Sequence, residues 1–217
     1  MQIEKVELVL KFTEMMLGTA PKNKGIYDQY ILEKLREAHK KGKISSADLK
    51  KREISEIESI EEMEEKNITG FRKDEHGIFL LDYMFRGFFK AAAKADKDQI
   101  DIKQTTSKID NFLFVFPRVV YLKRNGNIIK KSDGLLERTG RVQTPQGPRT
   151  ALLSSEKVDA GCTAEIEIQL IKNREISMNV VMEWLEYGKL CGIGQWRNAS
   201  HGRFEFMVKK SKGGSKK

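Results

Sequence analysis

The sequence predicts an α+β protein in which helices cover one face of an antiparallel sheet. Three segments alternate apolar with polar residues, as half-buried strands do: 6–12, 164–170 and 203–208. Two other segments, 82–95 and 179–190, place their apolar residues at the spacing of a helix face. Because strands and helices are interleaved along the chain, we expect two layers, one of helices and one of strands.

In the first half of the chain, the strand at 6–12 comes first, and residues 26–38 could form a helix. A short apolar run at 78–81 precedes the helix expected at 82–95, for which Asp82 is the candidate N-cap. The apolar positions that predict a buried face on this helix are Phe85, Phe88, Phe89, Ala92 and Ala93.

In the second half, residues 112–116 form an unbroken apolar pentad that 119–122 continues as extended chain. The strand at 164–170, the helix at 179–190 and the strand at 203–208 follow. The resulting order is the βαββαβ arrangement of a ferredoxin-like (RRM-like) domain. Its uncovered sheet face would be free for ligands or neighbouring subunits.

The composition is typical of a globular protein with a basic surface. The 217 residues are 39% apolar and 33% charged, with a formal net charge of +9. No apolar run approaches the roughly 20 residues of a membrane span, and charges interrupt the N-terminal segment, so we expect a cytoplasmic protein without a membrane partner. Cys162 and Cys191 are far apart and the three histidines are scattered, so we expect reduced thiols, no metal and no cofactor.

The charges are arranged in blocks. We expect one domain over 1–208, followed by a disordered basic tail at 209–217 that holds five lysines. A charged insertion at about 34–66 begins with a basic block and ends with a run of seven glutamates over 53–65. This insertion is either a solvated segment, helical in part, or a mobile lobe on a phosphate surface.

A second basic segment, 118–149, holds eight basic residues against two acidic ones and is interrupted by glycines and prolines. Such a stretch between apolar strands has little packing role. We expect a basic hairpin or thumb at about 123–149 that contacts a polyanion, the alternative being a merely solvated loop.

The segment 192–204, GIGQWRNASHGRF, joins the last helix to the last strand. Gly192 and Gly194 allow the main chain to approach a ligand, Arg197 and Arg203 supply positive charge, and Trp196 offers a stacking surface. No strand precedes the G-x-G and no helix follows it, which excludes a dinucleotide-binding turn. The alternative is a helix C-cap followed by a simple turn.

This segment resembles the glycine-rich loop of the RAMP superfamily, the RNA-binding proteins of CRISPR effector complexes, where G-x-G and then G-R-F or similar lie between the last helix and strand of a ferredoxin-like domain. Three other segments resemble the family in the same order: GTAPKNKG at 18–25, FRG at 85–87 in place of L-K-G at a helix start, and 149–163, which ends in Gly-x-Thr before a strand. The family's proline and paired serines before the helix are replaced by residues 81–84.

The likeness is closest to the small backbone subunits that polymerise along a guide RNA, and a diverged phage or mobile-element member would read the same way. It implies that the helix start and glycine-rich loop hold the RNA sugar-phosphate backbone while the thumb inserts between bases, with little dependence on nucleotide sequence. The residues expected to contact nucleic acid are Lys22, Lys24, Arg86, Lys90, Lys130, Lys131, Arg138, Arg141, Arg149, Gly192, Gly194, Gln195, Trp196, Arg197, His201, Gly202 and Arg203.

Some members of this superfamily cleave RNA, so an endoribonuclease activity is the enzymatic alternative. His201 is the best candidate for a general base, and Asp28 and Asp74 lie in loops where backbone-subunit relatives carry a cleaving aspartate. The sequence holds no paired carboxylates, no Ser/His/Asp order and no phosphate-binding P-loop. A binding role is therefore favoured over catalysis.

Two functional hypotheses follow. In the first, the protein is a guide-RNA-binding backbone subunit that assembles head to tail with copies of itself and with other effector subunits. In the second, it is a phage or mobile-element protein that binds single-stranded DNA in replication or recombination, or that mimics a CRISPR subunit. Both predict binding of single strands that weakens steeply with salt.

Overall fold

The structure is a computed structural model that describes residues 1–21, 68–100, 102–144 and 147–209. The expected helix at 26–38, the charged insertion and nearly all of the tail lie outside these ranges. The chain divides into two compact units. The first comprises 1–18, 71–134 and 157–217, and the second comprises 19–70 and 135–156.

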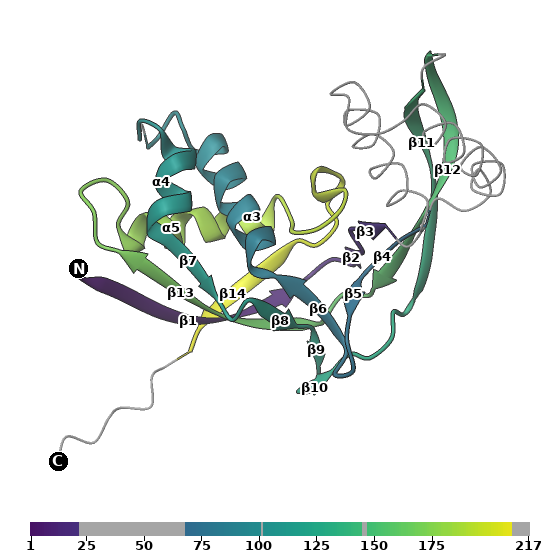
Figure 1. The fold of residues 1–217 in the computed structure, drawn as a ribbon, viewed down its shortest axis with the longest axis horizontal. Coiled ribbons are helices and arrows are strands. Elements are labelled where there is room, and N and C mark those ends of the chain that lie inside the picture. Colours follow the sequence, from purple (N-terminus) through teal and green to yellow (C-terminus); the bar gives the residue numbers. More distant parts are fainter. Residues whose placement is uncertain (22–67, 101, 145–146, 210–217) are drawn as a thin grey trace, which may run out of the picture. The chain divides into compact units, whose positions relative to one another are not determined.

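The main sheet of the first unit confirms the strands expected at both ends of the chain (Figure 1). It contains β1 (Ile3–Phe12), β7 (Leu113–Phe116), β13 (Thr163–Ile171) and β14 (Phe204–Val208). β1 pairs with β13 on one side and β14 on the other, β13 also pairs with β7, and every pair is antiparallel. The strand order is therefore β14–β1–β13–β7.

Three helices cover one face of this sheet: α3 (Asp82–Ala95), α4 (Thr105–Phe112) and α5 (Met178–Glu186) (Figure 1). The protein is thus α+β, as the sequence predicts. Helix α5 starts at the cap Ser177, whose side chain accepts from the Val180 amide, and it ends in the 3₁₀ turn η1 (Tyr187–Lys189).

The start of α3 differs from the expectation. Leu81 is the N-cap and no side chain caps the helix, whereas Asp82 is its first residue. The Asp82 carboxylate instead accepts from Arg86 Nη2, one turn later, at 3.1 Å. Asp82 therefore stabilises the first turn as a carboxylate near the positive end of the helix dipole and as a partner for Arg86.

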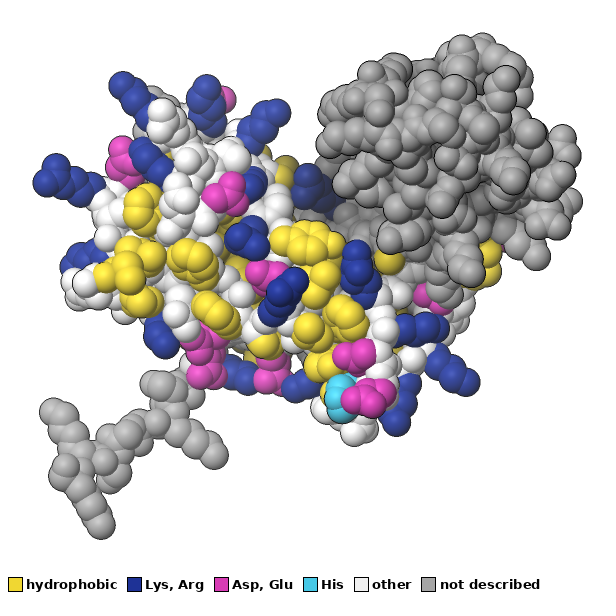
Figure 2. Space-filling view, viewed as in Figure 1, with side chains coloured by type: hydrophobic (Ala, Val, Ile, Leu, Met, Phe, Trp, Pro, Cys, Tyr) yellow, Lys and Arg dark blue, Asp and Glu magenta, His cyan; other side chains and the backbone are white. Residues whose placement is uncertain are grey.

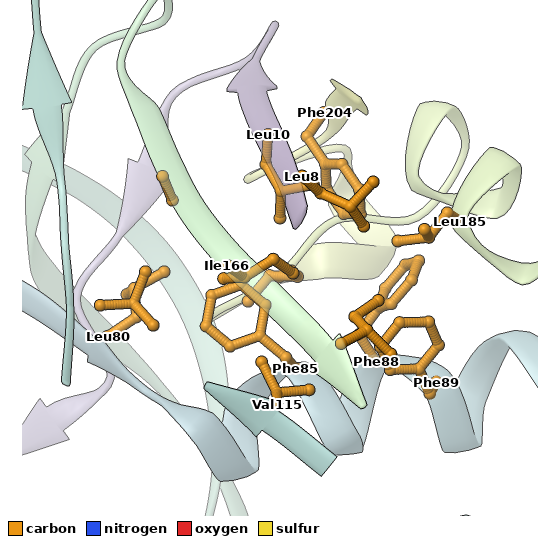
Figure 3. Packing of buried hydrophobic residues seen from close by; sticks show 14 of the residues in the cluster. Leu8, Leu10, Leu80, Phe85, Phe88, Phe89, Val115, Ile166, Leu185 and Phe204 are labelled. Carbon is orange, nitrogen blue, oxygen red and sulfur yellow. The ribbon is translucent and has the colours of Figure 1, made fainter. Parts of the chain in front are cut away.

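The core forms where the apolar stripe of α3 meets the sheet. Phe85, Phe88 and Phe89 are buried and lie against residues of β1 and β13 (Figure 3). These three positions follow the spacing of one helix face, and Leu8 and Leu10 follow the two-residue period of a strand, so each element presents its apolar side to the other. Trp184 and both cysteines are also buried.

The extended segment after the apolar pentad enters a different sheet. β8 (Val119–Tyr121) pairs with β6 (Ile78–Leu81), which also pairs with β5 (Arg72–Lys73), in a three-stranded antiparallel sheet. A short hairpin, β9 (Lys123–Arg124) and β10 (Asn127–Ile128), then joins the main sheet through β13. The apolar run alone did not reveal this change of sheet.

The second unit is a smaller sheet. β3 (Ala20–Pro21) pairs with β4 (Ile68–Gly70), which lies parallel to part of β12 (Gly147–Val158). β12 also neighbours β11 (Gly134–Thr144). At its other end, within the first unit, β12 pairs with β2 (Met16–Leu17). The segment expected to hold one basic hairpin at about 123–149 thus spans the short β9–β10 hairpin and part of the long β11–β12 pair.

An ion pair fixes the chain between β10 and β11. Asp133 accepts from Arg124 Nη1 at 2.9 Å and from Nη2 at 2.6 Å, and its Oδ2 also accepts from the Asp159 amide at 2.8 Å. The Arg124 hydrogen bonds lower the pKa of Asp133 from 3.8 to about 2. The ion pair therefore stabilises the folded protein fully at pH values above 3.8, the ordinary pKa of the Asp133 carboxyl group. This stabilisation is lost as the pH falls to about 2, where the carboxyl group becomes protonated in the folded protein.

Replacing Asp133 with Asn is therefore expected to lower the free energy of unfolding at pH 7 by about 1 kcal/mol, since the pair is partly screened by solvent. Urea unfolding of both proteins between pH 7 and pH 2 measures this loss, which should shrink as the pH falls. Asp98→Asn, which changes an exposed carboxylate in the same way, is the matched control. A loss that is the same at every pH would contradict the assignment.

Candidate nucleic-acid interface

One row of residues on α3 faces away from the core. Tyr83, Gly87, Lys90 and Lys94 follow one another at intervals of four, three and four residues, on the side of the helix opposite Phe85 and its buried neighbours. We call this row the α3 stripe. Tyr83 is 50% exposed and Lys94 is exposed, whereas Gly87 and Lys90 are half-buried.

Most of the α3 stripe lines a groove of about 1030 Å³. The first turn of α4 forms part of the opposite wall with the hydroxyl groups of Thr105, Thr106 and Ser107, and no side chain caps this helix. Lys97 and Arg197 complete the cationic lining. Figure 2 shows Lys and Arg side chains gathered around the outer ends of α3 and α4.

The charge of the groove is positive. Its lining includes four cationic side chains and one carboxylate, Asp110. Lys90 Nζ donates to Asp110 at 2.7 Å, with both side chains partly exposed, so this ion pair fixes the position of the ammonium group at small energetic gain. Small residues, hydroxyl groups and surplus positive charge together suit a phosphodiester chain, which carries one negative charge per nucleotide.

The glycine-rich loop contacts α3 directly. Arg197 Nη1 donates to the carbonyl oxygen of Gly87 at 3.4 Å. The two segments that the sequence predicted to share a surface, around Arg86 and in the glycine-rich loop, therefore meet at this hydrogen bond. Trp196, the neighbour of Arg197, is 39% exposed.

Two glycines of the loop bring its ends together. A Cβ atom at Gly192 would lie 2.0 Å from the His201 carbonyl oxygen, and one at Gly202 would lie 2.1 Å from the Ile193 carbonyl oxygen. Ile193 N donates to the Gly202 carbonyl at 3.0 Å across this contact. The sequence suggested that Gly192 lets the main chain approach a ligand. The structure gives Gly192 and Gly202 a role inside the chain, because they let backbone pack on backbone.

Other expected residues of the loop have contacts within the protein. Arg203 Nε donates to the Leu190 carbonyl oxygen at 3.0 Å, which ties the end of the loop to its start. Gly194 has a φ of +104°, and Gln195 and the half-buried His201 lie in the same loop. Whether these residues also contact nucleic acid stays a prediction.

The remaining expected contacts are dispersed. Lys130 and Lys131 are exposed beyond β10 in the first unit. Arg138 on β11 is half-buried, and burial lowers the pKa of its guanidinium group. The main chain at Arg141 and Arg149 is in β11 and β12, but their side chains, like the whole of Lys22, Lys24 and Asp28, lie outside the described parts of the chain.

Asp74, a candidate cleaving aspartate, has a structural role in the turn between β5 and β6. Its Oδ1 accepts from the amides of His76 and Gly77, and its Oδ2 accepts from the Tyr121 hydroxyl at 2.6 Å. The Tyr121 hydrogen bond is the largest cause that lowers the pKa of this carboxyl group. Both oxygens are engaged and the carboxylate is a weakened base, so this geometry suits a turn.

The open face of the main sheet is a mosaic of opposite charges. Glu165 accepts from Lys123 Nζ at 2.8 Å and from Lys209, and Glu167 lies 3.8 Å from Lys5 Nζ. The carboxylates alternate with the buried residues of β13, so they point away from the helices. Because these ammonium groups are already close to carboxylates, this face offers phosphate less positive charge than the groove on the helical side.

Sequence reasoning missed Tyr83, Lys94, Lys97 and the hydroxyl groups of α4. The α3 residues could have been predicted from the sequence, because they lie on the side of the helix opposite its apolar face. Helix α4 gave no such signal, because Ile109 is the one buried residue among its eight, TTSKIDNF. Among the described residues, no group of three or more His, Cys, Asp and Glu is placed to hold a metal ion, and no helix has the length and apolar character to cross a membrane.

No family model and no curated protein matches the sequence. Solved structures of CRISPR complexes contain similar chains. In a type IV-B CRISPR complex the match covers 98% of this chain and 93% of the other, at 9% identity and a TM-score of 0.48. In the cryo-EM structure of type III-B Cmr-beta bound to cognate target RNA it covers 96% of this chain, at 9% identity and a TM-score of 0.47. This chain spans 60% of the length of that second one.

Proposed function

We propose that this protein is an RNA-binding subunit of a CRISPR-type ribonucleoprotein complex, and that it holds the sugar-phosphate backbone of a single strand along the α3 stripe. The observation that carries the proposal is the hydrogen bond from Arg197 to the Gly87 carbonyl, because it joins the glycine-rich loop to the cationic groove. Lys90, Lys94 and Arg197, which line the groove, are the proposed phosphate contacts. Arg86 lies beside the stripe and is paired with Asp82, so its contact with nucleic acid stays a prediction from the sequence.

The length of the stripe sets the number of nucleotides. Tyr83 and Lys94 are eleven residues apart, which corresponds to roughly 16 Å along the helix axis at 1.5 Å per residue. A stacked strand advances about 3.4 Å per nucleotide, so the stripe would accommodate about five stacked nucleotides and fewer extended ones. Phosphate contacts dominate this site, and affinity should therefore depend little on nucleotide sequence.

The first unit would serve as the body of such a subunit. If β1, β7, β13 and β14 are counted as strands one to four, their order in the sheet is four, one, three, two. This order supports the ferredoxin-like arrangement that the resemblance implies. We further propose that copies assemble along one RNA strand. A fixed number of nucleotides per protein copy, measured by mass photometry on RNAs of increasing length, would support this assembly, whereas a single copy on every length would contradict it.

The proposed function is tested by binding equal-length RNA and DNA single strands at several salt concentrations. We expect RNA to bind more tightly than DNA. The logarithm of the binding constant should fall linearly with the logarithm of the salt concentration, and the steepness of this line is the salt slope. Replacing Lys90 and Lys94 with Ala should reduce the slope by roughly 1 to 1.5, at about 0.7 per lost phosphate contact on a single strand. Fluorescence anisotropy measures both quantities.

A matched control removes the same charge elsewhere. Lys5 and Lys11 lie on the open face of the main sheet, and replacing both with Ala should leave the slope nearly unchanged. Equal effects of the two double variants would mean that the protein attracts RNA by net charge alone and would overturn the groove assignment. A clear preference for DNA would favour the phage or mobile-element hypothesis.

A further inference from the structure

Tyr83 is an exposed aromatic residue at one end of a cationic row. It is 50% exposed on the first turn of α3, and Lys90 and Lys94 follow on the same side of the helix. A tyrosine that stays half exposed contributes less to folding than a fully buried one. An aromatic ring next to cations is, however, the combination that binds single-stranded nucleic acid.

Gly87 lies one turn after Tyr83 and leaves space beside it. A glycine inside a helix costs about 0.5–1 kcal/mol relative to alanine. At Gly192 and Gly202 a glycine is required, because any side chain would clash with neighbouring backbone. At Gly87 a Cβ atom would find no heavy atom within 4 Å, so packing within the described part of the chain does not require a glycine there.

The glycine-rich loop approaches this open space from another side. Arg197 donates to the carbonyl oxygen of Gly87, and Trp196 exposes 39% of its side chain next to it in the sequence. The surface over Gly87 therefore has an aromatic ring one turn before it, a lysine one turn after it and a guanidinium group at its edge. These are the groups that would stack a flat base and bind the phosphate attached to it.

We propose that Tyr83 and Gly87 form a stacking site for one unpaired base, with the Tyr83 ring against the base and the bare main chain of Gly87 beneath it. This inference rests on the proposed function, since it takes the strand to follow the α3 stripe. It adds a contact with a base to the contacts with the backbone: the site requires a base that is free to leave a stack, and it discriminates against a duplex, in which both faces of each base are covered.

The experiment compares an oligouridylate with an abasic sugar-phosphate strand of the same length, using the full chain and fluorescence anisotropy. Tyr83→Ala should weaken binding of the oligouridylate roughly 5- to 150-fold, the range found when a stacking aromatic residue is removed. It should leave binding of the abasic strand and the salt slope unchanged, because no charge is removed. Tyr83→Phe should retain the wild-type affinity, because it keeps the ring.

A second variant tests the open space. Gly87→Leu places a side chain where the base would lie, and we expect it to reduce oligouridylate binding about as much as Tyr83→Ala does. Leucine is a better helix former than glycine and meets no neighbour at its Cβ, so the melting temperature should stay the same or rise. A loss of binding together with retained stability cannot be attributed to misfolding.

The outcomes separate the two proposals. If Tyr83→Ala binds the oligouridylate as tightly as the wild type, or weakens both strands equally, the stacking site is wrong while the proposed function stands. If the wild type binds neither strand, both are wrong. If the wild type binds both strands equally well and Tyr83→Ala changes neither affinity, the protein holds the backbone alone and the stacking site is again overturned.

Discussion

Replacing Phe88 with Ala is expected to lower the free energy of unfolding by about 3–5 kcal/mol. Phe88 is 1% exposed. The centroid of its ring lies 5.0 Å from that of Phe204 and 5.5 Å from that of Phe89, both in edge-to-face geometry. Truncation removes these contacts and leaves a cavity between α3 and β14, which the surrounding strands and helices can fill only in part. Urea unfolding monitored by circular dichroism measures the loss.

The matched control is Phe116→Ala on β7. This phenylalanine is 44% exposed on the open side of the main sheet, so the same substitution should cost less than about 1 kcal/mol. Similar losses for the two variants would mean that α3 does not pack on the sheet as described. RNA binding by Phe88→Ala should be retained under conditions in which the variant is still folded, because Phe88 faces the core.

The main sheet and two of its helices were predictable because their apolar residues follow a period. β1 and β13 bury every second residue over much of their lengths, and α3 buries Phe85, Phe88 and Phe89 at helical intervals. Burial of one face fixes the period, so the pattern and the fold have the same physical cause. Helix α4 has too few apolar residues for such a pattern, and its position depends on tertiary contacts.

The path of the chain between strands was less predictable. Residues 113–116 and 119–121 read as one apolar stretch but enter two different sheets, β7 with β13 and β8 with β6. An apolar run indicates that a segment is buried, and it carries no information about its partner. The same limit applies to β12, which pairs with β4 and β2 over residues that show no strict alternation.

The candidate site was predicted in outline and not in detail. Arginines and glycines near a helix end indicated a phosphate site, and the Arg197–Gly87 hydrogen bond brings the two segments together. The sequence could not distinguish glycines that approach a ligand from glycines that approach other backbone. That distinction depends on what an added Cβ atom would meet in space: nothing within 4 Å at Gly87, but carbonyl oxygens at Gly192 and Gly202.

The close backbone contact at Gly202 predicts a second large loss of stability. Gly202→Ala is expected to lower the free energy of unfolding by about 2–4 kcal/mol, since a left-handed backbone costs alanine about 1–2 kcal/mol and overpacking costs a similar amount. Gly202 has a φ of +69°, and its added Cβ would lie 2.1 Å from the Ile193 carbonyl oxygen. Thermal unfolding by calorimetry measures the loss.

Gly161→Ala isolates the conformational part of this cost. Its φ is +88° but nothing lies within 4 Å of an added Cβ, so the variant should lose only about 1–2 kcal/mol. Because the Gly202 contact closes the loop that carries Arg197, Gly202→Ala should also weaken RNA binding in its folded state, whereas Gly161→Ala should not. Equal stability losses would show that the backbone contact is not formed, and the loop would then lack one of the contacts that hold Arg197 at the groove.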